Sequence, residues 1–118
     1  MKTLIIGAST NPERYSYKAA YSLLNNGYEI VLFGVKKGEV NGHLIENTWN
    51  PDWKIDTVTM YINPQLQENY YKNIIALKPR RVIFNPGTEN PEFYQLLKLN
   101  NIKVEIACTL VLLTTNQY

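Results

Sequence analysis

The first segment that could do chemistry is a loop of small and polar residues after an apolar run near the N-terminus. It comprises Gly7, Ala8, Ser9, Thr10, Asn11 and Pro12, and Arg14 follows shortly after it. Small residues let backbone N–H groups approach an anion closely, the hydroxyl groups of Ser9 and Thr10 are further donors, and an arginine forms charge-assisted hydrogen bonds with phosphate. The pattern therefore predicts a phosphate-binding loop. Because only Gly7 of the dinucleotide fingerprint G-x-G-x-x-G is in place, an ordinary strand-to-helix turn is the alternative.

A pair of lysines follows the second apolar run, in the segment Gly34-Val35-Lys36-Lys37-Gly38. A protein that binds NAD usually has an Asp or Glu at this point, which accepts hydrogen bonds from the ribose hydroxyls. A lysine instead suits an additional phosphate, such as the 2′-phosphate of NADP or the 3′-phosphate of coenzyme A. The alternative is that both lysines are solvated in a turn.

Two further segments stand where predicted strands end, so they could line the same crevice. Tyr61, Asn63 and Pro64 offer apolar and aromatic surface to an adenine, although Asn63 would also serve as a plain helix cap. The segment Asn85-Pro86-Gly87 would place an amide and a backbone turn at the crevice, or would form an ordinary proline–glycine turn.

Residues suited to catalysis are scarce. The single histidine, His43, lies in an irregular region, so a histidine-based triad or a metal cluster has little to build on. Cys108 follows a predicted strand and precedes a predicted helix, where the pKa of a thiol can fall, but a small buried apolar cysteine is the commoner outcome. We therefore expect no catalytic residue and no metal.

Short β-like runs alternate with helical stretches along the whole chain, which is typical of an α/β fold. Main strands are predicted over 3–7, 29–33, 57–62, 82–84 and 103–106. Helices are predicted over 15–26, 64–77, 91–99 and 109–114, and the irregular connection 36–56 carries a short strand around 43–45. Trp49 and Trp53 are expected to pack as a satellite core under that connection, and Arg80-Arg81 is expected to form a solvated edge.

These elements predict a single Rossmann-like domain over residues 1–118. Its doubly wound parallel sheet would have five strands in the order 3-2-1-4-5, counted along the chain, with helices on both faces. In such sheets the ligand binds beyond the C-terminal strand ends, where the strand order reverses. The loops that begin at Gly7, Gly34, Ile62 and Asn85 are therefore expected to meet at one crevice.

Composition limits the classes of function. Twelve basic and ten acidic residues give a net charge of +2, and no predicted helix gathers lysine and arginine on one face, which argues against nucleic-acid binding. A run of about 18 apolar residues is absent, so a membrane span is not predicted. One cysteine excludes an internal disulfide, and the short N-terminal apolar run is unlike a signal peptide, so a cytoplasmic protein is expected.

Taken together, these segments resemble the small stand-alone CoA-binding domain proteins, relatives of the CoA-binding domain in the succinyl-CoA synthetase α subunit. The resemblance covers nearly the whole chain. It rests on Gly7-Ala8-Ser9, Pro12, Arg14, Ser16, Lys36, Glu39-Val40-Asn41-Gly42, Asp56-Thr57-Val58, Asn63-Pro64, Pro86-Gly87-Thr88-Glu89-Asn90 and Cys108. The first segment and the Pro-Gly-x-Glu-Asn segment are the more specific ones.

The resemblance implies a Rossmann-like fold that binds coenzyme A at the C-terminal ends of its strands. It implies that the first loop meets the phosphates and that Lys36 is the family's lysine after the second strand. It also implies that Tyr61, Asn63 and Pro64 lie near the adenine. Members of this family usually have no assigned reaction.

The chain also departs from the family pattern. Gly34-Val35 stand where the family often has Asn-Pro, and Ile83 and Asn85 stand where Trp and Gln are common. Ile106-Ala107 replace an acidic and a basic residue before the cysteine, and Leu112 replaces a glutamate after it. These changes make the C-terminal part of the site more apolar.

We therefore expect a module that binds coenzyme A or an acyl-CoA without catalysing a reaction. One alternative is an NADP-linked or acyl-CoA enzyme component that acts with a partner chain. The other is an interaction module that has lost its ligand and pairs through its tyrosine-rich surface and apolar C-terminus, where Leu110 to Leu113 could form a homodimer contact.

Overall fold

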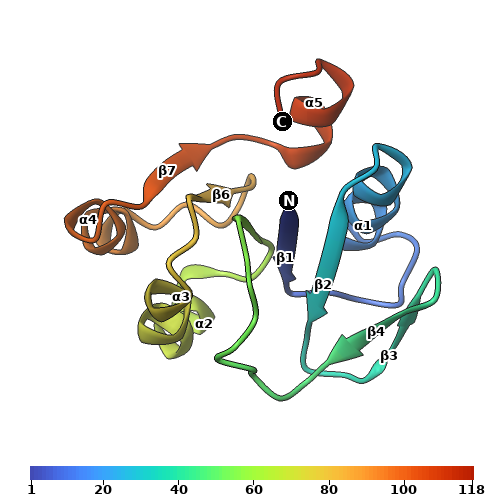
Figure 1. The fold of residues 1–118 in the computed structure, drawn as a ribbon, viewed down its shortest axis with the longest axis horizontal. Helices are drawn as coiled ribbons and strands as arrows, with labels where there is room; N and C mark the ends of the chain where they lie inside the picture. Colours follow the sequence, from blue (N-terminus) through green and yellow to red (C-terminus); the bar gives the residue numbers. More distant parts are fainter.

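The computed structural model describes all 118 residues and contains one sheet of seven strands (Figure 1). The strands are β1 (Lys2–Ile6), β2 (Glu29–Phe33), β3 (Gly38–Val40), β4 (His43–Glu46), β5 (Thr57–Met60), β6 (Arg81–Phe84) and β7 (Lys103–Ile106). The helices are α1 (Tyr15–Asn25), α2 (Pro64–Gln67), the 3-10 helix η1 (Glu68–Tyr70), α3 (Tyr71–Leu77), α4 (Pro91–Leu99) and α5 (Thr109–Thr114). The five predicted main strands are all present. None of the helices has the length and apolar character that crossing a bilayer requires.

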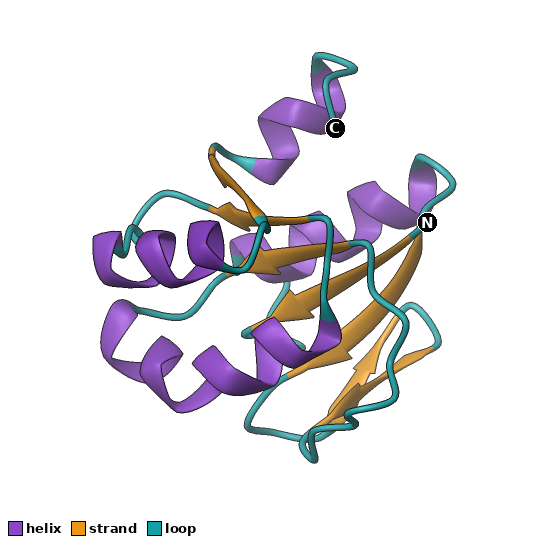
Figure 2. Cartoon of the chain, turned by 60° about the vertical axis from the view of Figure 1, so that its left-hand side comes forward, coloured by secondary structure: helices purple, strands orange, loops and turns teal.

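The central strand β1 lies between β2 and β5 and is buried on both faces. Leu4 and Ile6 pack into one core cluster with α3 and α4, whereas Ile5 packs into a second cluster with α1 and α5. Helices therefore cover both faces of the sheet, as predicted (Figure 2). Burial on both faces explains why β1 is a continuous apolar run rather than an alternating one.

The predicted strand order and strand number are wrong. The observed order is β3-β4-β2-β1-β5-β6-β7, so the third main strand, β5, pairs with β1 and not with β2. The place beside β2 belongs to β4, which pairs with it in parallel at Leu32–Ile45 and Phe33–Glu46. Because β3 and β4 pair antiparallel, the sheet is mixed. The connection 36–56 is long enough to supply this hairpin, which covers the edge that β2 would otherwise expose.

The long connection contains one strand that was predicted and one that was not. The strand expected around 43–45 is β4, whereas the three-residue β3 buries only Val40 and leaves little pattern to recognise. Trp49 and Trp53 pack against Phe33, with ring centroids 5.1 and 6.1 Å away, and Trp49 stacks on Tyr70. Both tryptophans therefore lie against the main core and do not form the separate satellite core that was predicted.

The single helix predicted over 64–77 is interrupted by η1. Its start is as expected, because the Asn63 side chain caps it by accepting a hydrogen bond from the Leu66 amide at 3.0 Å. At Tyr70 the backbone leaves the helical region (φ −119°, ψ 4°), and the ring of this residue packs 5.3 Å from that of Phe33. We attribute the interruption to this aromatic contact.

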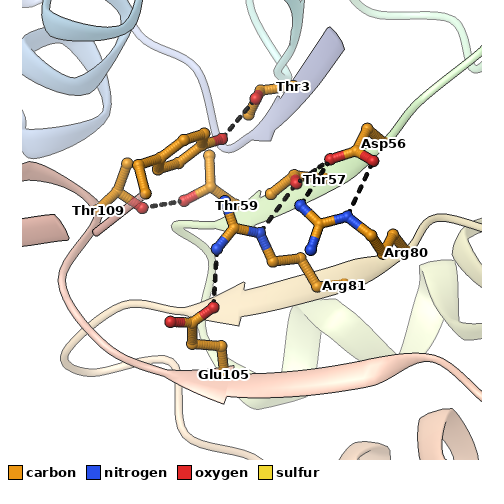
Figure 3. Close-up of polar contacts among 9 residues, drawn as sticks. Thr3, Asp56, Thr57, Thr59, Arg80, Arg81, Glu105 and Thr109 are labelled. Carbon is orange, nitrogen blue, oxygen red and sulfur yellow. Dashed lines mark hydrogen bonds and ion pairs between the residues drawn. The ribbon is translucent and has the colours of Figure 1, made fainter. Parts of the chain in front are cut away.

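Arg81 is buried where the sequence predicted a solvated edge, and that prediction is wrong for this residue. Its side chain is 3% exposed. Its Nε donates to Thr57 Oγ1 at 3.0 Å and its Nη1 donates to Glu105 Oε1 at 2.8 Å (Figure 3). The ring of Tyr118 lies 4.4 Å from the guanidinium carbon, and the Tyr118 hydroxyl bonds to Thr3. The aromatic ring compensates partly for Nη2, which is buried without a hydrogen-bond partner.

The neighbouring Arg80 does lie at a solvated edge. Its side chain is 50% exposed, and it donates two hydrogen bonds of 3.1 Å to the carboxylate of Asp56. These hydrogen bonds lower the pKa of Asp56. The lowered pKa means that the stabilisation by this pair is complete above the pKa of an unfolded aspartate and is lost as the pH falls through the folded value.

We predict that Arg81→Ala lowers the free energy of unfolding by about 3 kcal/mol, because it leaves Glu105 without its partner and opens a void beneath Tyr118. The matched control is Arg80→Ala, which removes a half-exposed ion pair and should cost about 0.5 kcal/mol. Urea unfolding of the two variants measures both values. Equal losses in the two variants would contradict the structural role assigned to Arg81.

Candidate functional site

A cavity of about 640 Å³ lies beyond the C-terminal ends of β1, β2, β5 and β6. The strand order reverses here, since β1 has β2 on one side and β5 on the other, and doubly wound sheets bind their ligands at this point. The residues lining the cavity are Gly7, Ala8, Ser9, Thr10, Glu13, Arg14, Tyr15, Ser16, Val35, Lys36, Tyr61, Ile62, Asn63, Pro86, Gly87 and Thr88. The four loops expected to meet at one crevice therefore all contribute to its wall.

The loop after β1 is wedged between the ends of its two neighbouring strands. The amides of Gly7 and Ala8 both donate to the carbonyl of Phe33 at the end of β2, at 2.9 and 3.0 Å. Gly7 has φ +97°, and a Cβ there would lie 3.0 Å from the Ile62 side chain after β5. A Cβ on Gly34 would lie 2.6 Å from the carbonyl oxygen of Ala8. Only glycine leaves room for the loop at these two positions.

Beyond this wedge the next two amides of the loop are left without partners. The N–H groups of Ser9 and Thr10 donate no hydrogen bond within the chain. Ser9 Oγ accepts from the Asn11 amide at 3.1 Å, which leaves the hydroxyl proton free to donate. The residue that caps α1, Arg14, forms no side-chain cap, so the amides in the first turn of α1 keep their positive potential. Such a group of donors is suited to an anion.

We predict that Gly34→Ala displaces this loop, because the added Cβ would collide with the Ala8 carbonyl. Amide resonances in the NMR spectrum should shift most strongly over residues 7–11, while urea unfolding shows that the chain still folds. Resonances that move no more at 7–11 than elsewhere would show that the loop does not depend on a glycine at position 34.

The opposite wall of the cavity is held by one buried side-chain amide. Gln67 is fully buried, and its Nε2 donates to the carbonyls of Ile62 and Thr88 at 2.9 and 2.8 Å. Its Oε1 accepts from Asn90 Nδ2 at 2.9 Å, and Asn90 caps α4 by accepting from the Phe93 amide. Gln67 thus fixes the loops after β5 and β6 at one separation.

Asn85 does not offer its amide to the cavity, in contrast to the sequence prediction. Its Nδ2 donates to Thr59 Oγ1 at 2.7 Å and to the Met60 carbonyl at 2.9 Å. Its Oδ1 accepts from the Thr109 amide at 2.8 Å. The nitrogen and the oxygen of this side-chain amide are therefore both hydrogen-bonded within the fold, where they join β5, β6 and the start of α5. Asn85 supports the loops around the cavity but does not line it.

Tyr61 lines the cavity, but its ring packs into the core cluster on the α1 and α5 face. Burial raises the pKa of its hydroxyl to about 12, so the phenol is neutral at physiological pH. Cys108 is partly buried near this tyrosine and does not line the cavity. No group of three histidine, cysteine, aspartate or glutamate side chains is placed to hold a metal ion.

Most of the residues predicted to bind a ligand lie in the cavity wall, namely Gly7, Ala8, Ser9, Thr10, Arg14, Ser16, Lys36, Tyr61, Asn63, Pro86 and Gly87. Pro12, Pro64 and Asn85 lie outside it. Five lining residues were not among those predicted to bind a ligand, namely Glu13, Tyr15, Val35, Ile62 and Thr88. Each is adjacent to a predicted residue, so extending each segment by one position would have included them. Ligand contact by any of these residues stays a prediction.

A mostly parallel sheet with helices on both faces and a cavity at its switch point defines a Rossmann-like α/β protein. The family described as "CoA binding domain" matches residues 1–114, and the chain belongs to this family.

Solved structures support the same fold. One uncharacterised protein is 50% identical, with a TM-score of 0.97 over 99% of this chain and 97% of its own. A Thermus thermophilus protein is 21% identical, with a TM-score of 0.86 over 99% and 90%. A hypothetical protein from Pyrococcus horikoshii is 25% identical, with a TM-score of 0.83 over 92% and 78%. No curated protein matches the chain.

Proposed function

We propose that the protein is a binding module that holds coenzyme A or an acyl-CoA in the cavity without catalysing a reaction. One observation carries the proposal: the cavity is lined by Ser9 and Thr10, whose amides have no partner within the chain, and by the cationic residues Arg14 and Lys36. Donors and cations in this arrangement suit a ligand with several phosphates. Membership of the CoA-binding domain family supports coenzyme A as that ligand.

In the proposed pose the pyrophosphate lies over the loop after β1, against the first turn of α1. The ribose then lies towards the end of β2, where the 3′-phosphate of coenzyme A accepts hydrogen bonds from Lys36. The β2 end also argues against NAD, because Gly34, Val35 and Lys36 provide no carboxylate for the ribose hydroxyls. NADP shares the extra phosphate and is therefore the competitor that needs a direct test.

We predict that Lys36→Ala weakens coenzyme A binding about tenfold, because a charge-assisted hydrogen bond to the 3′-phosphate is lost. Binding of dephospho-coenzyme A, which lacks that phosphate, should be unchanged. The matched control is Lys37→Ala, because Lys37 is an exposed neighbour that does not line the cavity. Calorimetric titration measures all the affinities.

The same titrations compare coenzyme A with NADP and NAD on the unmodified protein. Tight binding of coenzyme A alone supports the module, whereas tighter binding of NADP would favour a role in a nicotinamide-linked enzyme. If Lys36→Ala and Ser9→Ala both left the affinity for coenzyme A unchanged, the proposed pose would be wrong.

A second candidate, self-association, rests on exposed apolar side chains near the sheet edge at β7. Ile106 and Val111 are 61% and 55% exposed. Leu112 and Leu113 are buried within the fold, so a contact at α5 would have to use Leu110 and Val111 instead of the whole 110–113 segment. Light scattering with and without coenzyme A tests this candidate, which requires a dimer that forms irrespective of the ligand.

A further inference from the structure

Tyr15 stands apart from the other tyrosines of the chain. There are nine tyrosines, and eight are at least partly buried, whereas Tyr15 is 66% exposed. It is the first residue of α1 and it lines the cavity. A large aromatic side chain that is left exposed in the wall of a cavity contributes little to folding and is available to a ligand.

One face of its ring is next to a cation. The ammonium group of Lys18, three residues further along α1, lies 5.2 Å from the centroid of the Tyr15 ring. Lys18 itself does not line the cavity. A cation over one face of an aromatic ring is attracted to that face and leaves the other face free for stacking.

The other aromatic side chain of the cavity wall is more deeply buried. Tyr61 is partly buried and packs against the core cluster beside α1 and α5. Tyr15 is the more exposed of the two tyrosines and lines the same cavity as the proposed phosphate donors. Contact of the adenine with Tyr61 stays a prediction.

We infer that Tyr15 is the platform on which the adenine of the bound nucleotide stacks, an inference that rests on the proposed function. The ring of Tyr15 distinguishes ligands that carry a base from ligands that carry only phosphate. In this arrangement the adenosine turns back over the start of α1, and the pantetheine arm leaves along the wall formed by the loops after β5 and β6.

The test uses two halves of the ligand. Adenosine 3′,5′-bisphosphate carries the base without pantetheine, and 4′-phosphopantetheine carries a phosphate without the base. Tyr15→Ala should weaken binding of coenzyme A and of the bisphosphate about tenfold, since a base stacked on an aromatic ring contributes that much or more. Binding of 4′-phosphopantetheine should not change. Tyr15→Phe, which keeps the aromatic ring, should bind coenzyme A with the affinity of the unmodified protein. Leu99→Ala removes an exposed apolar side chain outside the cavity and should have no effect.

A spectroscopic readout separates stacking from support of the loop. Adenine H2 and H8 should shift upfield in the NMR spectrum of the complex with the unmodified protein, and the shift should vanish with Tyr15→Ala. Unchanged affinity of Tyr15→Ala for coenzyme A, or equal losses for the two half-ligands, would overturn the inference while the proposed function stands. Failure of the unmodified protein to bind coenzyme A would overturn both.

Discussion

The cavity depends on one steric constraint, the close crossing of the loop after β1 over the ends of β2 and β5. The backbone at Ala8 passes so near to Gly34 that an added methyl group would collide with it, and Gly7 has a positive φ with little room beside Ile62. At the crossing, the amides of Gly7 and Ala8 both donate hydrogen bonds to the carbonyl of Phe33. The amides of the next two residues, Ser9 and Thr10, have no partner within the chain, and unpaired donors in the lining of the cavity suit an anion.

The buried side-chain amides of Asn85 and Gln67 fix the other loops of the cavity relative to that crossing. Asn85 joins β5 and β6 to the start of α5, and Gln67 joins the two loops that form the far wall. Each uses both ends of its amide, so a shorter or apolar side chain would leave several backbone groups without partners. The shape of the cavity wall is therefore set by buried hydrogen bonds as well as by loop packing.

The sequence predicted well those parts of the fold that rest on local pattern. Continuous apolar runs identified the buried strands, and Asn63 and Asn90 each precede a proline at a helix start that the structure confirms. Strand order could not be predicted, because the place beside β2 is taken by a short hairpin whose two strands bury only Val40 and Ile45. The burial of Arg81 and Asn85 could not be predicted from local sequence either, because their partners are at least 24 positions away in the chain. Polar residues at strand ends more often contact solvent or a ligand.

The contacts of Arg81 also tie together parts of the chain that are far apart in sequence. Glu105 in β7 accepts a hydrogen bond from this guanidinium, the Tyr118 ring lies against it, and Tyr118 bonds to Thr3 in β1 across 115 positions of sequence. A buried cation costs free energy unless its partners are in place. The strand β6 is therefore stable in the sheet only together with β7 and the segment after α5, so a change at Tyr118 would be felt in the middle of the sheet.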